Sequence, residues 1–464
     1  MYQQYFIAVI LFALAASAAV HALLNKSDSR SAFGWIAVSL IFPLFGPILY
    51  FLFGINRTEK RAVRLDYYSR KRKFDSHQHQ TGIIKTLKNV QDVAHQLSKQ
   101  PLVGGNNVEV LYSGTHAYPA MLAAINSAQE YIYLSTYIFK VDDIGKQFIE
   151  ALTQAKHREV KVFVLIDGVG DYYSITKASK ILKKNGIDVD RFLPPRLIPF
   201  NIYINLRNHR KILVVDNNVC FVGGMNISEE YAGNQPDSPR DIHFRLTGNI
   251  TQQVKHLFES DWKFTNQQST GIKDTTSETI TSPMWCRIIT DGPGVNMGYL
   301  SIVLFSAINA ATESITIMSP YFLPTQALIR SLQVAALRGI EVSIVLPEKN
   351  NLVYVDWACR HMLWQLIGSG INIYYQPAPF EHSKLFIIDN HYSLIGSANF
   401  DPRSLRLNYE IGVEIYDEQL ASELSQYTLK VIAGSHLVTL DELAQRSFPV
   451  KIRDGIAWLF SPYL

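Results

Sequence analysis

Two segments of this 464-residue chain carry one pattern of chemically active side chains, H-x-K-x₄-D-x₆-G-[GS]-x-N. The first copy comprises His209, Lys211, Asp216, Gly223, Gly224 and Asn226, and the second comprises His382, Lys384, Asp389, Gly396, Ser397 and Asn399. A single H-x-K-x₄-D is expected by chance at roughly a few per cent in a chain of this composition. Two copies with the same downstream glycine and asparagine therefore indicate a duplicated functional unit.

These residue types suit the displacement of an alcohol from a phosphodiester. Lysine and asparagine side chains can hold the phosphate oxygens and stabilise the charge that develops on them. One neutral imidazole can attack phosphorus and form a phosphohistidine, while the other, protonated, delivers a proton to the leaving oxygen. Histidine suits both tasks because its pKa lies near neutrality. The pattern predicts phosphoryl transfer that needs no metal, and no other cofactor is expected.

The aspartates of the motif belong to the candidate catalytic set, but their position favours a structural task. Asp216 and Asp389 each lie seven residues after the histidine of their copy. On a strand, an odd offset points to the opposite face, whereas Lys211 shares the face of His209. Asparagine follows each aspartate, which is typical of a hairpin turn. We expect Asp216 and Asp389 to brace that turn.

The small and amide-bearing residues of the motif are candidates for binding the substrate phosphate. Gly224 and Ser397 belong to the small pairs that allow the backbone to approach an anion closely. Asn226 and Asn399 can donate amide hydrogens to the same anion. We therefore expect these four residues to form a phosphate-binding set.

Two carboxylates that follow the motifs are candidates for orienting the histidines. A nucleophilic imidazole needs an acceptor on its second ring nitrogen, because that contact fixes the tautomer. Asp241 follows the first motif and Glu410 follows the second. For each of them an ordinary surface carboxylate is the alternative interpretation.

The segments around the motifs alternate between predicted strands and helices, and they do so twice. The tripeptide Ala-Ile-Asn at 124–126 and again at 307–309 ends a helical stretch that leads into an apolar strand. Such alternation is typical of α/β layers with a parallel or mixed sheet. We expect an α/β fold of two pseudo-symmetric lobes, residues 105–265 and 284–464, with a polar linker over 266–283. A pseudo-two-fold axis would then assemble both motifs into one shared active site.

The N-terminal segment, residues 1–56, is predicted to form a transmembrane hairpin of two helices. The run from Tyr5 to Leu24 has no Asp, Glu, Lys or Arg and is as long as a membrane-spanning helix. A second apolar run extends over 32–54, and membrane helices tolerate prolines such as its Pro43 and Pro47. A cleaved signal peptide is the alternative, but the start lacks basic residues and a second apolar run follows directly.

Basic residues predict how this hairpin is oriented. Eight lysines and arginines lie between residues 57 and 73, at the start of a connector over 57–104. The loop between the two apolar runs offers only Lys26 and Arg30. The positive-inside rule then predicts a multi-pass protein of the cell inner or plasma membrane with cytoplasmic lobes. The basic stretch either contacts anionic lipid head groups or serves only as a topology signal.

The net charge and the cysteine content of the chain indicate which partners and which cellular compartment are expected. The net charge of +4 is mild for this length and does not favour nucleic acid. The three cysteines, Cys220, Cys286 and Cys359, form no C-x-x-C pair, and their number is odd. They therefore predict neither a zinc site nor a disulfide framework. Cys220 lies in an apolar run and is expected to be a small core residue, and a reducing compartment is the simplest setting.

Around both motifs and at the N-terminus, the chain resembles the phospholipase D superfamily and, within it, the bacterial cardiolipin synthases. Beyond the motifs, the resemblance rests on the stretches GWIAVSLIFPLFGPILYFLFG, RNHRKILVVDNNVCFVGGMNISEEYAG, SPYFLPTQALIRSLQVAALRG, HSKLFIIDNHYSLIGSANFDPRSLRLNYE and FSPYL. It covers nearly all of the chain. The motifs are specific for the chemistry, and the flanking stretches narrow the substrate.

The resemblance implies two phospholipase D-like lobes and a phosphatidyltransferase that takes a phosphatidyl group onto one histidine and passes it to an acceptor. In cardiolipin synthases donor and acceptor are both phosphatidylglycerol, and glycerol leaves. The resemblance favours His209 as the nucleophile and His382 as the acid, while the pseudo-symmetry of the copies leaves the opposite assignment open. The implied partners are phospholipid and membrane, without nucleic acid, and the oligomeric state stays open.

Two departures from the family pattern occur beside the motifs. Pro239 stands where the family usually has tryptophan before Arg240 and Asp241, and Glu381 precedes the second histidine where an apolar residue is more usual. Neither departure removes a reacting group. A phospholipase D-type hydrolase, a transferase with another acceptor alcohol and an inactive scaffold are the alternatives, and the complete motifs argue against the scaffold. A nuclease is disfavoured because the chain lacks a strongly basic balance.

The first half carries an extra stretch before its motif, from Leu193 to Asn208, that the second half lacks. It is apolar, with Arg196 and Arg207 near its ends. One interpretation is a lip that enters the membrane interface beside the active site. The other is a connection packed on the core.

Overall fold

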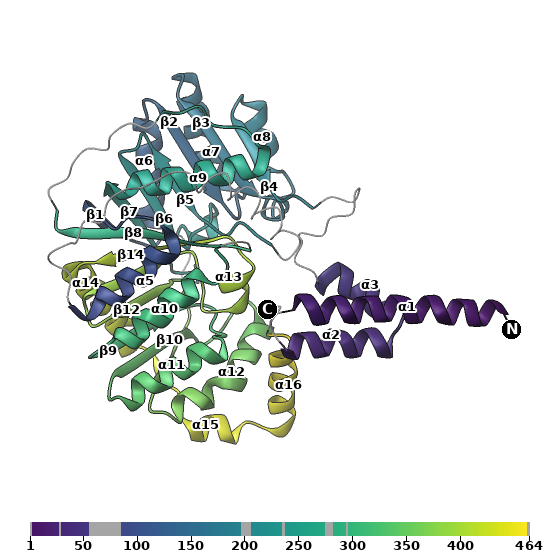
Figure 1. The fold of residues 1–464 in the computed structure, drawn as a ribbon. Coiled ribbons are helices and arrows are strands. Elements are labelled where there is room, and N and C mark those ends of the chain that lie inside the picture. The colour runs from purple at the N-terminus through teal and green to yellow at the C-terminus, as the bar shows by residue number, and fades with distance from the viewer. Residues whose placement is uncertain are drawn as a thin grey trace. The chain divides into compact units, whose positions relative to one another are not determined.

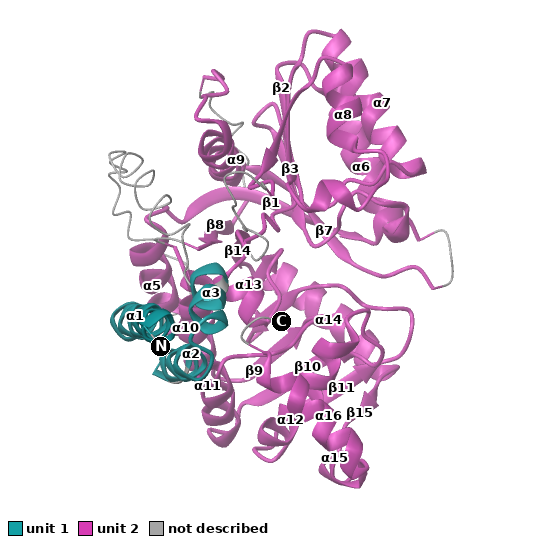
Figure 2. Ribbon diagram, turned by 90° about the vertical axis from the view of Figure 1, so that its right-hand side faces the viewer, with its two compact units in different colours: residues 1–68 teal, residues 69–464 magenta. Residues whose placement is uncertain are grey.

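The computed structural model describes residues 2–26, 29–54, 85–195, 206–233, 237–273, 282–293 and 296–461 (Figure 1). The chain divides into two compact units, residues 1–68 and 69–464 (Figure 2). The cluster of basic residues over 57–73, the middle of the expected linker and most of the extra stretch before the first motif lie outside the described residues.

The first unit is helical. Its elements are α1 (Tyr2–Asn25), α2 (Ser29–Ile41), α3 (Phe45–Leu49) and a π-helical turn, η1 (Tyr50–Gly54). Ala18 and Ala22 on one face of α1 are buried with Tyr50, whose hydroxyl lies 2.8 Å from Nδ1 of His21. Most of the other apolar side chains of α1 are exposed, as in a helix that faces lipid.

The expected second spanning helix is interrupted. α2 has 13 residues and ends shortly before Pro43, and the chain then resumes as α3 and η1. Proline ends a helix because it lacks an N–H and its ring clashes with the preceding turn. Among the described residues, α1 alone has the length and hydropathy of a membrane span.

The second unit contains the two lobes, which repeat one order of strands. The first lobe contains β1 (Val103–Tyr112), β2 (Tyr131–Thr136), β3 (Lys161–Asp167), β4 (Asp188–Phe192), β5 (Ile212–Val215), β6 (Val219–Gly223) and β7 (Ile242–Gly248). The second contains β8 (Met284–Asp291), β9 (Ser314–Met318), β10 (Glu341–Pro347), β11 (Asn372–Gln376), β12 (Leu385–Ile388), β13 (Tyr392–Gly396), β14 (Glu410–Tyr416) and the short β15 (His436–Leu437).

Helices cover the sheet in both lobes (Figure 1). Those of the first lobe are α6 (Gly114–Ser127), α7 (Asp143–His157), α8 (Ala178–Lys184) and α9 (Ile250–Asn266), with the 3₁₀ turns η3 (Gly170–Tyr172) and η4 (Glu229–Tyr231). Those of the second are α10 (Tyr299–Ala310), α11 (Gln326–Leu337), α12 (Val353–Ile367), α13 (Pro402–Arg406), α14 (Glu418–Ala433), α15 (Leu440–Gln445) and α16 (Phe448–Leu459).

The described strands form one sheet that runs through both lobes. Its order is β15-β11-β10-β9-β12-β13-β14-β8-β1-β7-β6-β5-β2-β3-β4. The lobes meet where β1 pairs antiparallel with β8, and outward from this pair the strand order of one lobe repeats that of the other. β2, β3 and β4 are parallel, as are β9, β10 and β11. The predicted repeat of two α/β lobes with a mixed sheet is confirmed.

Strand periodicity places two cores on opposite faces of the sheet. In β2, Ile132 and Leu134 are buried with α6 and α7, whereas Tyr131 and Tyr133 are buried with α9. Successive side chains of a strand point to opposite faces, and all six residues of β2 are buried, so this strand is covered on both sides.

The expected connector over 57–104 is not only a connector. It contains η2 (Lys85–Leu87) and α5 (Lys88–Ser98), and β1 begins at Val103 rather than at 105. Leu87, Val90 and Ala94 form an apolar stripe at helical spacing and are buried in the core of the second lobe beside α10. The end of this segment therefore belongs structurally to the lobe that comes later in the chain.

Candidate active site

The two motifs lie where the lobes meet. We expected each H-x-K triplet to lie on a strand. Instead, each triplet is extended chain that directly precedes a strand, β5 in the first motif and β12 in the second. The backbone N–H of His209 donates to the carbonyl of Tyr409 at 2.9 Å, and that of His382 donates to the carbonyl of Arg240 at 2.7 Å. Tyr409 precedes Glu410 and Arg240 precedes Asp241, so these bonds bring each candidate carboxylate to the histidine of the other lobe.

The side chains of these residues complete the crossed arrangement. Nδ1 of His209 lies 3.0 Å from Oε1 of Glu410, and Nδ1 of His382 lies 2.7 Å from Oδ2 of Asp241. Both carboxylates are buried. A carboxylate at Nδ1 favours the tautomer that carries its proton there, which leaves the lone pair on Nε2 for chemistry. Each histidine is thus completed by a residue of the opposite lobe.

The motif lysines lie against the same histidines. Nζ of Lys211 donates to the carbonyl of His209 at 2.7 Å, and Nζ of Lys384 donates to the carbonyl of His382 at 2.5 Å. Nζ of Lys384 is also 3.1 Å from Nδ1 of His382. Burial disfavours the charged ammonium and lowers the pKa of Lys384, and lowers that of Lys211 well below its usual value. Two buried lysine side chains beside the histidines suit a negatively charged group, because such a group would stabilise their charged form.

Both imidazoles are held neutral. Burial lowers the pKa of His209, although Glu410 opposes the shift. Burial, together with the charge of Lys384, lowers the pKa of His382 to about 4. A neutral imidazole is the form that can act as a nucleophile or a base.

The two partner carboxylates are held ionised. Burial by itself raises the pKa of Asp241, but Lys384 and His382 outweigh it and the net pKa is lowered. For Glu410 burial is likewise outweighed, here by the contact and hydrogen bond with His209 and by the charge of Lys211, and the net pKa is lowered. The site in this state pairs neutral histidines with charged acceptors.

Asp216 and Asp389 lie at the predicted hairpin turns, between β5 and β6 and between β12 and β13. Asp216 accepts hydrogen bonds from the backbone N–H groups of residues 129, 130 and 131, at 2.7 to 2.8 Å. Asp389 accepts from those of residues 312, 313 and 314, all at 2.8 Å. The aspartates therefore brace the turn against the entrance of the neighbouring strand, β2 or β9, and their oxygens are engaged there rather than at a phosphate.

The phosphate-binding set differs from expectation at its small residues. The hydroxyl of Ser397 donates to Oε2 of Glu410 at 2.5 Å and accepts from the N–H of Ile411 at 3.1 Å, so it positions the carboxylate. A Cβ on Gly224 would lie 2.5 Å from Oδ2 of Asp241 and 2.9 Å from Nζ of Lys384. Gly224 thus makes room for the Asp241 carboxylate and the Lys384 ammonium. The spacing of the motif residues predicts a small residue at position 224, but it does not show whether that residue makes room for protein side chains or for a substrate anion.

The two asparagines also have protein partners. Oδ1 of Asn226 accepts from the N–H of Ile138 at 3.2 Å, and its amide nitrogen donates no hydrogen bond within the described residues. The amide nitrogen of Asn399 donates to the hydroxyl of Ser404 at 3.3 Å. Asn226 is therefore the better placed of the two to donate to a substrate.

Aromatic rings that are not part of the motifs surround the histidines. Tyr137 packs edge-on against His209, with 5.5 Å between ring centroids. Tyr231, Tyr321 and Phe380 lie around His382 at 5.7, 6.3 and 5.8 Å. Tyr137 follows β2 and Tyr321 follows β9. Because ligands bind at the carboxyl ends of parallel strands, this position in the sequence could have identified both tyrosines as residues of the site.

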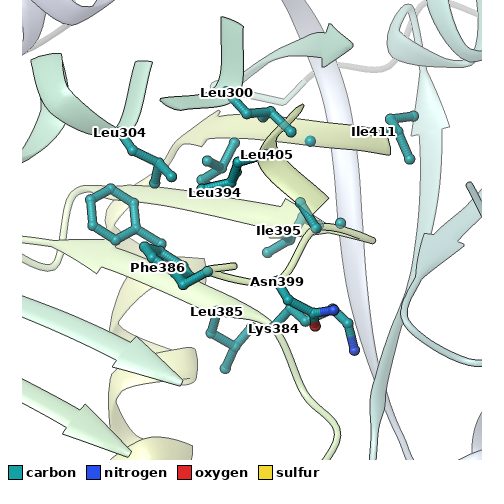
Figure 3. Close-up of a pocket in the computed structure, with 14 residues that line it drawn as sticks. Leu300, Leu304, Lys384, Leu385, Phe386, Leu394, Ile395, Asn399, Leu405 and Ile411 are labelled. Atoms are coloured by element: carbon teal, nitrogen blue, oxygen red, sulfur yellow. The ribbon is translucent and has the colours of Figure 1, made fainter. Parts of the chain in front are cut away.

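A small apolar cavity lies in the second lobe. It has a volume of about 30 Å³ and lies beneath Lys384 and Asn399, with Leu300 and Leu304 of α10 on its far side (Figure 3). In the first lobe Tyr118 of α6 donates from beneath the motif to the carbonyls of residues 226 and 228, at 2.8 and 2.9 Å. The equivalent position of α10 is Ser301, six residues before the repeated Ala-Ile-Asn.

The cysteines are core residues and not metal ligands in the described part of the chain. All three cysteines are free and buried, and Cys220 is a core residue as predicted. Among the described residues, no group of three or more His, Cys, Asp or Glu could hold a metal ion.

Comparison with known proteins places this site in a family. The family described as "Cardiolipin synthase, PLD-like domain" matches residues 121–262 and 304–432, and a family of N-terminal segments, "Phospholipase_D-nuclease N-terminal", matches residues 13–54. Cardiolipin synthase 2 of Staphylococcus epidermidis is 31% identical over an alignment of 465 residues that covers 95% of this chain and 94% of the relative. The major cardiolipin synthase ClsA of Bacillus subtilis is 30% identical over 460 residues, with 95% of each chain covered.

Solved structures share the two-lobed fold at low sequence identity. The phosphatidylserine synthase of Haemophilus influenzae aligns with a TM-score of 0.62 and 15% identity over 81% of this chain and all of that chain. The polyphosphate kinase of Porphyromonas gingivalis aligns with a TM-score of 0.50 and 13% identity, over 80% of this chain and 53% of that chain. These likenesses concern the fold alone. The repeated domain match and the relatives aligned over nearly the full length show that the chain belongs to the cardiolipin synthase family of the phospholipase D superfamily.

Proposed function

We propose that this chain is a cardiolipin synthase, which joins two phosphatidylglycerol molecules and releases glycerol. The observation that carries the proposal is the crossed pair of histidine–carboxylate contacts, which holds two neutral imidazoles in one lysine-lined site between the lobes. The names of the relatives that match 95% of the chain support the substrate class.

In the first step, Nε2 of His209 attacks the phosphorus of one phosphatidylglycerol, and the bond from phosphorus to the head-group glycerol breaks. Glycerol leaves with a proton from Nε2 of His382, and a phosphatidyl-histidine remains. The side chain of His209 is 14% exposed and that of His382 is 7% exposed, so His209 offers the more open ring for attack. Lys211, Lys384 and the amide of Asn226 would hold the phosphate oxygens.

In the second step, the head-group hydroxyl of another phosphatidylglycerol attacks the same phosphorus. His382, now neutral, takes the hydroxyl proton, the bond from phosphorus to His209 breaks, and cardiolipin leaves. His382 must therefore start the cycle protonated, although its pKa is about 4 without substrate. The phosphodiester anion raises this pKa because it offsets the charge of Lys384 beside the ring.

Purified full-length protein and phosphatidylglycerol with a labelled head group test the reaction. Cardiolipin and free glycerol are expected in equal amounts, with no loss of rate in a chelator. Phosphatidic acid without cardiolipin would instead identify a phospholipase D-type hydrolase, and a product with another alcohol would identify a different transferase. If the His209→Ala variant still gives a trappable phosphoenzyme, His382 is the nucleophile.

The membrane part of the proposal is a two-helix hairpin with the lobes in the cytoplasm. α1 supports the first crossing by its length. α2, α3 and η1 together supply the second apolar run, interrupted near Pro43. Because the native cysteines are buried, single new cysteines report topology with an impermeant thiol reagent. Lys26→Cys should be labelled in intact cells, and Asp188→Cys, on the surface of the first lobe, only after permeabilisation; the reverse pattern would contradict this topology.

A further inference from the structure

Exposed apolar side chains gather after equivalent strands of the two lobes. Beyond the end of β3, Tyr172, Tyr173 and Ile175 are 54%, 57% and 106% exposed. Beyond the end of β10, Val353 and Tyr354 are 51% and 47% exposed. We call these five residues the rim. Single exposed apolar residues are ordinary, but a group contributed by both lobes marks an interaction surface.

The rim lies against the rings that contact the catalytic histidines. On the side of the first lobe, the ring of Tyr173 packs on Tyr137 at 6.1 Å, and Tyr137 packs on His209 at 5.5 Å. The strands explain this adjacency, because β3 is parallel to β2 and their carboxyl ends share one edge of the sheet.

The second lobe repeats the arrangement. Tyr321 packs on His382, and its hydroxyl donates to Oδ1 of Asn351 at 2.8 Å, two residues before Val353. The pKa of Tyr321 is raised, chiefly by burial, with contributions from Tyr354 and Tyr173. Rim tyrosines of both lobes therefore lie near one ring at the site.

Cations accompany the rim on the side of the first lobe. Nζ of Lys177 lies 3.4 Å from the centre of the Tyr172 ring, and this contact with Lys177, with Arg191 nearby, lowers the pKa of Tyr172. Neither cation forms an ion pair with a carboxylate among the described residues. The acidic residue of this loop, Asp171, is buried and accepts from the hydroxyl and N–H of Ser179. The positive charge here is thus not neutralised by the loop.

We propose that the rim docks the active site on an anionic phospholipid surface, with its side chains in the interface and Lys177 and Arg191 at head-group phosphates. Tyrosine suits this position because it has an apolar ring and a polar tip, and cations suit it because the surface is negative. α1 has the length and hydropathy of a membrane-spanning helix, so a bilayer is the partner that the chain itself suggests. The inference rests on the proposed function, which explains why docking is useful. A lipid in the docked membrane can present its phosphate to the histidines while its acyl chains stay in the bilayer.

A dye on the rim tests the contact itself. In full-length protein reconstituted in vesicles, Ile175→Cys is labelled with an environment-sensitive dye, and Leu337→Cys at the end of α11, 78% exposed, is the matched control. We expect the dye at 175, but not at 337, to shift its emission to the blue and to be quenched by lipids that carry a spin label in vesicles containing phosphatidylglycerol. A dye at 175 that stays in water would overturn the proposal. A dye shielded without lipid quenching would indicate a protein partner and would also overturn it.

A kinetic comparison tests the consequence for turnover. The variants Tyr172→Ser, Ile175→Ser and Val353→Ser are assayed on phosphatidylglycerol in vesicles and on a short-chain form dispersed as monomers. For the triple variant we expect the ratio of the vesicle rate to the monomer rate to fall about tenfold, equivalent to about 1.4 kcal/mol, with no change for Leu337→Ser. An unchanged ratio would overturn docking by the rim. If the parent protein makes no cardiolipin from either form, the proposed function fails, and the dye still decides whether the rim meets lipid.

Discussion

Replacing Asp241 by asparagine tests whether a carboxylate of one lobe controls the histidine of the other. Oδ2 of Asp241 is buried 2.7 Å from Nδ1 of His382, and Lys384 approaches the same nitrogen to 3.1 Å. Asparagine keeps the size of the side chain and one acceptor oxygen but removes the charge. If its amide nitrogen faces the ring, the imidazole adopts the opposite tautomer, and Nε2 carries the proton instead of the lone pair.

The expected loss of activity follows from these contacts. A hydrogen bond to a charged group is worth about 1.5–3 kcal/mol, and each 1.36 kcal/mol corresponds to about tenfold in rate. Loss of the charge alone therefore predicts a rate about 10 to 150 times lower. The wrong tautomer adds to this, since the equivalent Asp-to-Asn change in a serine protease triad costs about 10⁴-fold. We expect kcat to fall by about 10² to 10⁴.

The assay is cardiolipin formation by full-length protein in mixed micelles, with acid quenching to trap the phosphoenzyme. His382 is proposed to act in both steps, so both phosphoenzyme formation and its transfer should slow. Asp237→Asn, an exposed carboxylate of the same segment, serves as the matched control and should keep the rate of the parent. Asp241→Asn protein that melts at the temperature of the parent and keeps more than a tenth of its rate would refute the crossed-pair reasoning.

Three further predictions follow from the same geometry. Gly224→Ala should lower the transfer rate about tenfold or more, because its Cβ would displace the Asp241 carboxylate and Nζ of Lys384. Asp389→Ala leaves three backbone N–H groups without their acceptor, so urea unfolding should show a loss of about 3 kcal/mol or more, while the folded fraction keeps its turnover. Burial, opposed by Asp241, lowers the pKa of His243 to about 4, so the folded state binds fewer protons than the unfolded state between about pH 4 and 6.5. The parent loses that stability as the pH falls through this window, and His243→Gln should lose about 2 kcal/mol less between pH 7 and 5 in unfolding experiments; equal losses would contradict this reasoning.

Much of the fold follows from local pattern. The hairpins at Asp216 and Asp389, the helix-to-strand repeat and the two-lobed sheet depend on short-range signals, namely turn residues and apolar periodicity. The contribution of α5 to the second lobe was missed, because an apolar stripe at Leu87, Val90 and Ala94 predicts a buried face but not the partner that covers it.

The site was harder to predict than the fold. Asp241 and Glu410 could be named as candidates from their position after the motifs, but which histidine each one meets depends on the two-fold arrangement and on backbone bonds between lobes. Ser397 was assigned to the phosphate, whereas its hydroxyl contacts Glu410. A motif defines which groups are near one another, and only the three-dimensional arrangement decides which of them remain available for a substrate.

Because both lobes are parts of one chain, the halves of the site can diverge. In a homodimer of a single lobe, every substitution would appear on both sides of the symmetry axis, and both histidines would have the same surroundings. Here Gly224 of the first motif corresponds to Ser397 of the second, and the position of Tyr118 in the first lobe carries Ser301 in the second. Because the lobes are covalently joined, the surroundings of the two imidazoles can differ, so that one imidazole is adapted for attack on phosphorus and the other for proton transfer.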